Sequence, residues 1–226
     1  MKEKKIDIII THYNRKERLL KTLDILSKQT EKEFNLIIND DGSNSDNIIN
    51  PNEYKIITKY IWNVDDGYHR VYRFNESASI SVSPKMILLD DDCVPQSEKF
   101  VETYVRLLDE YDVIQGNLFI LFANHLNEHF FSTANLGIRK DVYNKIGLFD
   151  INFDGSYGYE DIDLGYRVKN NNEIKFGLNL DDDLLAHHGY DTYKDGDRSD
   201  EVIGKNKKYL EEKWGIKINK WGQIID

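Results

Sequence analysis

The sequence predicts a single α/β domain with a mostly parallel central sheet flanked by helices. Short apolar runs rich in β-branched residues alternate with amphipathic helical segments over the first half of the chain. Such alternation favours parallel strands joined by right-handed crossovers. Polar clusters follow three of the apolar runs directly. Because ligands bind at the carboxyl ends of strands in open α/β sheets, these clusters predict one binding edge.

The first half supplies the strands of that edge. Residues 6–10 are predicted to form a buried strand that ends in a polar loop, and residues 15–27 a helix with Asn14 as its N-cap. Residues 34–38 predict a second strand, and residues 54–62 a third. Further along, residues 86–89 predict a strand, residues 98–108 a helix and residues 113–122 a strand.

The second half is less regular. The pattern predicts two short strands and three helical segments there, at residues 135–138 and 184–186 and at residues 140–146, 161–169 and 201–214. No internal repeat or Pro-rich linker divides the chain. We therefore expect one domain over residues 1–226, with a nucleotide-binding half to about residue 95, an acceptor half over about 96–190 and a helical tail over 191–226.

Composition narrows the class of protein. The 226 residues are 40% hydrophobic and 31% charged, which is typical of a soluble globular domain. The net charge of −10 disfavours nucleic acid as a partner, because proteins that grip phosphate backbones are usually basic. The single cysteine, Cys93, and the lack of a long apolar stretch lead us to expect a cytoplasmic protein or a soluble domain of a larger one.

Three carboxylates, Asp90, Asp91 and Asp92, directly follow a predicted buried strand. Clustered carboxylates repel one another unless a cation neutralises them or water solvates them. Mg²⁺ and Mn²⁺ prefer such oxygen ligands and often share substrate phosphates. The cluster is thus either a cation site beside a phosphate or an acidic turn. Two adjacent imidazoles, His187 and His188, end a later apolar run, and one of them is a candidate further metal ligand.

A Gly- and Tyr-rich segment, residues 153–159, leads into Glu160 and Asp161 at a predicted helix start. Either carboxylate is suited to act as a general base toward a hydroxyl. The helix dipole alone also explains acidic residues at this place. A third interpretation is a calcium loop, because Asp150, Asn152, Asp154 and Gly155 occupy positions one, three, five and six of an EF-hand, with Asp161 where Glu is expected.

Two further pairs are candidates for donor binding. Tyr13 offers an aromatic face and Asp41 a carboxylate for a nucleobase, although the sequence around Asp41 also suits a plain turn. Arg70 and Arg73 lie one helical turn apart and suit a phosphate, unless they are solvated surface residues.

In this order, the clusters resemble glycosyltransferase family 2, which has the GT-A fold with a Rossmann-like nucleotide-binding half. The resemblance covers residues 6–189. It is carried by Thr-His-Tyr-Asn at 11–14, Asp-Asp-Gly-Ser at 40–43, the Asp-x-Asp motif at 90–92, and the segments 135–140, 146–150 and 158–167. The last segment is similar to chondroitin and heparosan synthase domains and to β-1,4-galactosyltransferases.

The resemblance implies donor-binding roles for Thr11, Tyr13, Asp41, Asp90 and Asp91. Tyr13 would stack on uracil, Asp41 would accept its imide N–H, and Asp90 would approach the ribose or the metal. Arg70 or Arg73 would meet the diphosphate. Family members often carry Arg directly before the residue aligned with Asn75, whereas this chain has Phe74.

The resemblance also implies a metal bound by Asp92 and by His187 or His188, with His187 preferred. Asp161 would be the catalytic base, and Glu160 would position the acceptor or donor sugar.

Together these roles imply an inverting, metal-dependent transfer of a sugar from a UDP-sugar to the hydroxyl of a glycan or other acceptor. Mn²⁺ is the expected cation and Mg²⁺ the alternative. The rival functions are a calcium-binding module on the Asp150–Asp161 loop and a non-catalytic sugar-nucleotide binder. A nucleotidyltransferase is disfavoured because the loop at residues 11–14 has no glycine.

Overall fold

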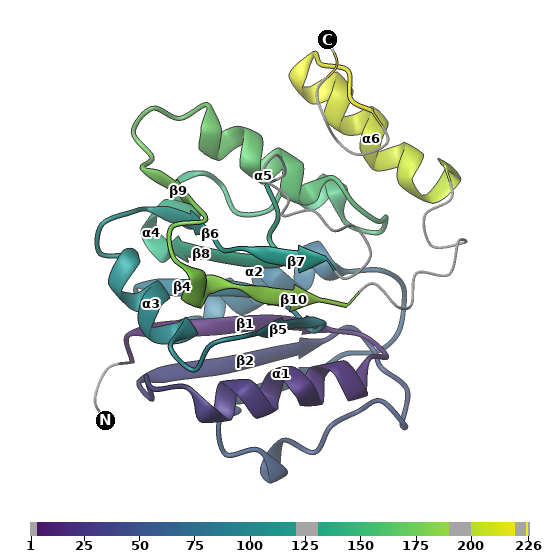
Figure 1. Cartoon of the computed structure of the whole chain (residues 1–226). Coiled ribbons are helices and arrows are strands. Elements are labelled where there is room, and N and C mark those ends of the chain that lie inside the picture. Colours follow the sequence, from purple (N-terminus) through teal and green to yellow (C-terminus); the bar gives the residue numbers. More distant parts are fainter. Residues whose placement is uncertain (1–3, 121–130, 190–199, 220–224, 226) are drawn as a thin grey trace.

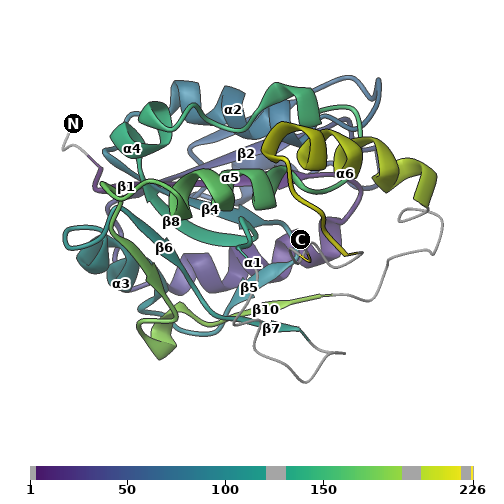
Figure 2. The ribbon, with the colours of Figure 1, turned by 90° about the horizontal axis from the view of Figure 1, so that it is seen from above.

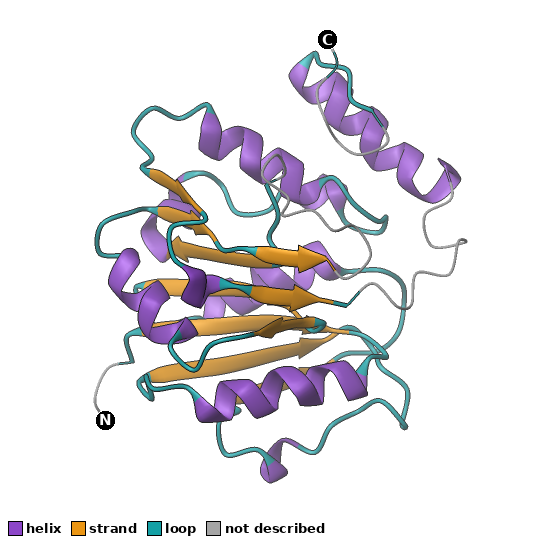
Figure 3. Ribbon diagram, in the orientation of Figure 1, coloured by secondary structure: helices purple, strands orange, loops and turns teal. Residues whose placement is uncertain are grey.

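The computed structural model describes residues 4–120, 131–189, 200–219 and 225. A seven-stranded sheet forms its centre (Figures 1 and 3). Its strands are β1 (Ile6–His12), β2 (Phe34–Asp40), β3 (Lys59–Trp62), β4 (Lys85–Asp90), β6 (Val113–Gln115), β8 (Asn135–Arg139) and β9 (Phe176–Leu178), in the spatial order β3-β2-β1-β4-β8-β6-β9.

The sheet is mostly parallel, as the sequence predicts. β1 pairs in parallel with β2 and β4, and β2 with β3, whereas β8 runs antiparallel to both β4 and β6. In the register of β1, Thr11 faces Asn39 on one side and Asp90 on the other. The three strands therefore end at one edge, where their polar loops meet.

A second sheet of three short strands extends this edge. It is formed by β5 (Cys93–Pro95), β10 (Ala186–His188) and β7 (Leu118–Ile120), with β10 in the middle. β10 is antiparallel to β5, and His188 pairs with Cys93. This pairing brings the two histidines to the aspartate cluster from almost 100 residues away.

Helices cover both faces of the central sheet. They are α1 (Lys16–Lys28), α2 (Arg70–Ile80), α3 (Phe100–Leu107), α4 (Lys140–Lys145), α5 (Glu160–Lys169) and α6 (Asp200–Trp214), with 3₁₀ turns η1 (Pro51–Glu53), η2 (Ile151–Phe153) and η3 (Asp182–Leu184). Seen from above, α2 and α4 lie on one side of the sheet, and α3 lies with the small sheet on the other (Figure 2).

Two hydrophobic cores follow from this layering. Ile8 and Ile10 belong to the core shared with α1 and α3, whereas Ile9 belongs to the core shared with α2, α4, α5 and α6. A strand covered on both faces needs apolar residues in succession, which explains the three consecutive isoleucines, residues 8–10, of β1. Within the described part of the chain, no helix combines the length and apolarity needed to span a bilayer.

Several elements differ from the sequence prediction. Arg15, not Asn14, is the N-cap of α1. Asn14 takes a left-handed φ of 52°, and its side chain accepts a hydrogen bond from the Asn44 amide. Only β3 forms within the strand predicted at residues 54–62. The strand predicted at residues 113–122 is divided into β6 and β7, and residues 121–122 lie outside the described residues.

Candidate active site

Arg70, the first residue of α2, joins two carboxylates from different halves of the chain. Its Nη2 lies 2.6 Å from Asp90 Oδ1 at the end of β4, and its Nη1 lies 2.6 Å from Glu160 Oε1 at the start of α5. Burial opposes the ionisation of Asp90, but Arg70 and His188 hold its pKa below the ordinary value. Arg70 thus fixes the distance between the Asp-x-Asp motif and the Glu-Asp pair.

Asp92 and His188 form a candidate cation site. Asp92 Oδ1 lies 3.3 Å from His188 Nε2, and Asp90 Oδ2 lies 3.8 Å from the same nitrogen. Oδ1 of Asp92 is buried and accepts no hydrogen bond from the described residues. Burial raises the pKa of Asp92 to about 6, and the neighbouring aspartates contribute. A buried carboxylate oxygen without a donor, beside an imidazole, is a fitting ligand set for a divalent cation.

Cys93 is close enough to join this site. The ligand atoms of Asp92, Cys93 and His188 all lie within 4.8 Å of one another. However, burial and the three aspartates raise the pKa of the Cys93 thiol well above its ordinary value. The side chain of Cys93 is also part of a hydrophobic core, and Mn²⁺ and Mg²⁺ prefer oxygen and imidazole ligands to a thiol, so Asp92 and His188 are the better candidates.

The sequence preference for His187 over His188 is corrected by the structure. Successive side chains of a strand point to opposite faces, and the two histidines are neighbours in β10. His188 faces Asp92, whereas the ring of His187 packs against Phe119 with centroids 5.2 Å apart. His188 is therefore the imidazole that faces the candidate cation site.

Asp91 points away from this site. Its Oδ2 lies 2.9 Å from His12 Nδ1, and its Oδ1 lies 3.3 Å from Arg15 Nη1. The amide of Tyr13 also lies 3.4 Å from Oδ2. Asp91, predicted to bind the donor, thus holds the loop that carries Tyr13.

The Glu-Asp pair begins α5 after a strained residue. Tyr159 takes a left-handed φ of 71°, which is costly for a bulky side chain. Burial, together with the adjacent Glu160, raises the pKa of Asp161 to about 7. A carboxylate with a near-neutral pKa is well suited to accept a proton from a hydroxyl.

The loops after β1 and β2 form the predicted nucleobase region. Tyr13 is 44% exposed and donates its hydroxyl hydrogen to Asp65, at 3.0 Å. Asp41 is nearly buried and accepts hydrogen bonds from Arg73 Nε and from the His69 amide, both at 2.8 Å. Burial raises the pKa of Asp41 despite these donors. Both side chains lie at the common edge, with the Tyr13 ring open to a ligand.

Four arginines lie beside carboxylates at this edge of the sheet. Arg70 and Arg73, proposed for a diphosphate, both bind carboxylates. Arg15 and Arg18, which the sequence pattern did not single out, have Nη1 atoms 3.6 Å and 3.2 Å from Asp92 Oδ2. Their three-residue spacing is the same signal that singled out Arg70 and Arg73.

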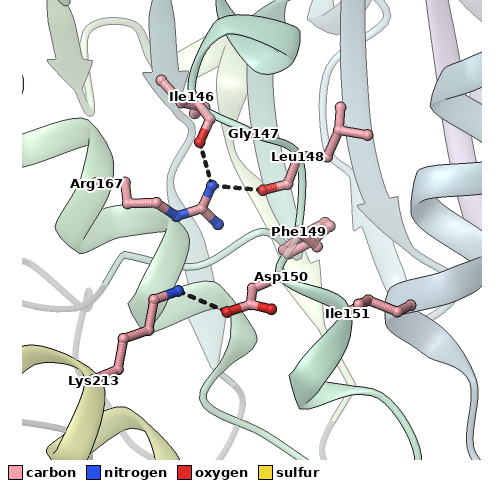
Figure 4. A pocket seen from close by; sticks show the side chains of 8 residues that line it. All are labelled: Ile146, Gly147, Leu148, Phe149, Asp150, Ile151, Arg167 and Lys213. Atoms are coloured by element: carbon pink, nitrogen blue, oxygen red, sulfur yellow. Dashed lines mark hydrogen bonds and ion pairs between the residues drawn. The ribbon is translucent and has the colours of Figure 1, made fainter.

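The carboxylates of the calcium-loop interpretation hold helices in place. Asp150 Oδ2 lies 2.8 Å from both Lys213 Nζ and the Tyr209 hydroxyl of α6. Asp154 Oδ2 lies 2.6 Å from His69 Nδ1. An open pocket of about 400 Å³ lies beside Asp150, where Arg167 and Lys213 point toward the segment 146–151 (Figure 4). An ammonium group and an imidazole thus already pair with two of the carboxylates that a calcium loop would use.

Comparisons with known proteins are consistent with one family. The family model described as glycosyl transferase family 2 matches residues 7–152. Validoxylamine A glucosyltransferase from Streptomyces hygroscopicus subsp. jinggangensis is 24% identical over 72% of this chain and 51% of its own length. The hyaluronan synthase of Pasteurella multocida is 25% identical over 89% of this chain and 26% of its own. The chondroitin synthase of strain Pm70 is 26% identical over 72% and 23%.

This chain therefore spans about half the length of the first of these relatives and about a quarter of the two synthases. Solved structures share its fold. Staphylococcus aureus TarS matches with a TM-score of 0.71 at 14% identity, over 92% of this chain and 39% of its own. The mannosyltransferase PcManGT from Pyrobaculum calidifontis, solved with GDP-Man and Mn²⁺, matches with a TM-score of 0.64 at 10% identity, over 94% and 65%.

Proposed function

The chain belongs to glycosyl transferase family 2 and is a glycosyltransferase of the GT-A fold, and from this premise we propose an inverting, cation-dependent transfer of a sugar from a nucleotide-sugar to an acceptor hydroxyl. One observation carries the proposal. The donorless, buried oxygen of Asp92 faces His188 at the edge where Tyr13, Asp41 and Asp161 also lie. Such a convergence of cation ligands, an aromatic face and a base is what this reaction needs.

Asp92 and His188 would hold the cation, with Asp90 beside them. Carboxylate oxygen and imidazole nitrogen together suit Mn²⁺, with Mg²⁺ as the alternative. When bound, the cation would offset negative charge on the leaving diphosphate. The guanidinium groups of Arg15 and Arg18 lie on the same side of Asp92 and would add to that compensation.

Asp161 would serve as the base in a single displacement. Its carboxylate takes the proton of the acceptor hydroxyl while the hydroxyl oxygen bonds to the anomeric carbon. The bond from that carbon to the phosphate oxygen breaks, and the nucleoside diphosphate leaves with the electron pair. Attack from the face opposite the leaving group inverts the configuration. Arg70 would keep Glu160 in place beside this reaction, because it binds Glu160 and Asp90 at once.

The donor would be a UDP-sugar, with uracil on Tyr13. The half-exposed ring of Tyr13 and the nearby Asp41 support a stacked base with a hydrogen bond to the carboxylate. The glucosyltransferase and synthase names of the relatives support a glycan or other hydroxylated acceptor. The ammonium and imidazole partners of Asp150 and Asp154 favour this function over a calcium-binding module.

The two adjacent histidines offer a matched test of the cation site. We expect His188→Gln to weaken Mn²⁺-dependent UDP binding at least about 10-fold, since even outer-shell partners of metals are worth about 10–100-fold. His187→Gln should leave that affinity within about two-fold, because its ring faces Phe119. Titration calorimetry with UDP and with GDP, with and without Mn²⁺, measures both effects. Equal losses in the two variants would contradict the site.

Catalysis itself is tested by measuring turnover with a panel of nucleotide-sugars. If no donor is turned over, the chain would be only a sugar-nucleotide binder.

A further inference from the structure

Helix α6 lies beyond residues 7–152, which the family model matches, yet it packs on the segment that leads into Glu160 and Asp161. In Figures 1 and 2, α6 lies next to α5. We propose that Asn206 of α6 is a positioning residue for the Glu160–Asp161 pair. The inference rests on the proposed function for what that pair does, but it concerns how the pair is held.

The side-chain amide of Asn206 donates hydrogen bonds to three backbone carbonyls. It is fully buried, and its Nδ2 donates to the carbonyl oxygens of Phe153, Ser156 and Gly158 at 2.9, 3.0 and 3.0 Å. An amide nitrogen has two hydrogens, so at least one of them is shared between two acceptors. The reversed amide would set its oxygen against three carbonyl oxygens, which fixes the orientation as donor. Residues 153–158 therefore curl around one side chain.

Other contacts also hold this loop, since the Gly155 amide donates to the Tyr68 carbonyl at 2.9 Å and the Tyr68 and Tyr157 rings lie 5.9 Å apart. Asn206 adds three bonds to carbonyls of the loop, and two glycines with left-handed backbones lie among them. Gly155 and Gly158 have φ angles of 76° and 86°, and an added Cβ at either would meet no atom within 4 Å. Tyr159 follows with its own left-handed φ, and its carbonyl accepts the first helical hydrogen bond of α5, from the Asp163 amide at 3.0 Å. The course of the loop thus sets where the first turn of α5 begins, and with it Glu160 and Asp161.

Helix α6 also contacts α5 at residues that follow Glu160 and Asp161. Trp214 Nε1 donates to Asp163 at 2.9 Å, and Lys213 Nζ lies 2.6 Å from the same carboxylate. The Tyr166 and Trp214 rings pack with centroids 4.5 Å apart. α6 therefore contacts the chain before and after the Glu160–Asp161 pair, while the donor-side residues lie on loops of β1, β2 and β4. A defect in this contact should alter catalysis and leave donor binding intact.

Asn206→Ala tests the inference, with Gly204→Ala on the same helix as the control, since a Cβ at Gly204 meets nothing within 4 Å. We expect Asn206→Ala to lower kcat for transfer by about 10–100-fold, because small misplacements of reacting groups cost about that much. The donor Kd should stay within about two-fold, and backbone amides of residues 156–163 should exchange hydrogen faster. Gly204→Ala should leave kcat, Kd and exchange unchanged.

A second variant covers the case in which Asn206→Ala does not fold. Gly158→Ala disfavours the left-handed backbone while adding no contact, and it should reproduce the selective loss of kcat. Unchanged kcat in both variants, or donor affinity that falls in step with kcat, would overturn the inference. If the wild-type chain turned over no donor, that failure would belong to the proposed function. Hydrogen exchange would still decide the positioning role, since unchanged exchange over residues 156–163 in Asn206→Ala overturns it.

Discussion

Glu160 and Asp161 are neighbours in the sequence, but the fold gives them different partners. Glu160 is buried and binds Arg70, which ties it to Asp90. Asp161 accepts a hydrogen bond from the Ile162 amide, and its pKa is raised to about 7 by burial and by Glu160. Glu160 is thus held by an ion pair, whereas Asp161 gains a proton near neutral pH. This difference would suit the proposed role of Asp161 as the base.

Asp161→Asn should greatly slow transfer while the donor still binds. Loss of a positioned base typically costs about 10²–10⁴-fold in rate, and we expect a fall in kcat within that range with donor Kd unchanged. Asp141→Asn, at an exposed surface carboxylate, serves as the control. Full turnover by Asp161→Asn would contradict the assignment of the base.

The raised pKa of Asp161 adds a pH signature to the same variant. Its carboxylate must be ionised to act, so wild-type kcat/KM should fall as the pH drops below about 7. The pKa of Asp161 is near 3.8 in the unfolded chain and higher in the folded one, so the folded state binds the proton more tightly. The free energy of unfolding therefore decreases as the pH rises between these two values. Denaturant unfolding should find Asp161→Asn more stable than wild type at pH 8 and nearly equal to it at pH 4.

At the scale of elements, Asp7 anchors the start of β1. Its buried carboxylate accepts hydrogen bonds from the Ser81 and Ser83 hydroxyls at 2.6 Å each and from the Val82 amide at 2.8 Å, and Asn35 of β2 donates to it as well. Burial opposes its ionisation, but the hydrogen bonds outweigh burial and lower the pKa of Asp7. One side chain thereby joins β1, β2 and the turn between α2 and β4.

Asp7→Asn should destabilise the fold by about 2–3 kcal/mol at pH 7, because buried hydrogen bonds to a charged group are replaced by mismatched ones. A pKa lowered by folding gives stability that is present above the unfolded pKa and is lost as the pH falls through the folded pKa. The difference from wild type should therefore shrink between pH 7 and pH 3. Asp24→Asn, at an exposed pair with Lys28, should change little. A loss of the same size at both pH values would argue against an ionised Asp7.

Elements that bury their own apolar residues were readable from the sequence, including the short β8 and α4, whereas β5, β9 and the helix α2 were not. β1, β2, β4 and α1 follow from local periodicity, because each buries its own apolar residues against the sheet. The strands β5 and β9 have three residues each and are defined by their partners. α2 begins with Arg70, whose side chain pairs with Asp90 and Glu160, so a helix that looks polar at its start is fixed by distant carboxylates.

At the scale of the molecule, the site is assembled where two sheets and two helices meet. β1, β2 and β4 deliver Tyr13, Asp41 and Asp90, the small sheet delivers His188, and α5 delivers Asp161. Binding of a nucleotide with its cation would connect these parts, so it should stabilise the whole fold.

Saturating UDP with Mn²⁺ should therefore raise the Tm. At about 100 times Kd, binding adds about 2.7 kcal/mol, and each kcal/mol raises the Tm of a chain of this size by about 2–4 °C, which gives roughly 5–11 °C. Differential scanning fluorimetry with UDP alone, Mn²⁺ alone and both together measures the effect. Asp92→Asn should abolish the gain from the combination. An equal gain from UDP without any cation would contradict the cation requirement.

The α/β class, the family and the Asp-x-Asp and Glu-Asp motifs can be read from the sequence, because residues that are close along the chain carry those signals. The folded chain was needed to learn which histidine meets Asp92, which arginines face carboxylates, and that Asn206 reaches the loop before Glu160. The physical reason is that strand alternation separates His187 from His188 by face, and register and helix packing join residues that lie many positions apart. A single sequence records side-chain chemistry at each position, but it does not record which distant partner each side chain meets.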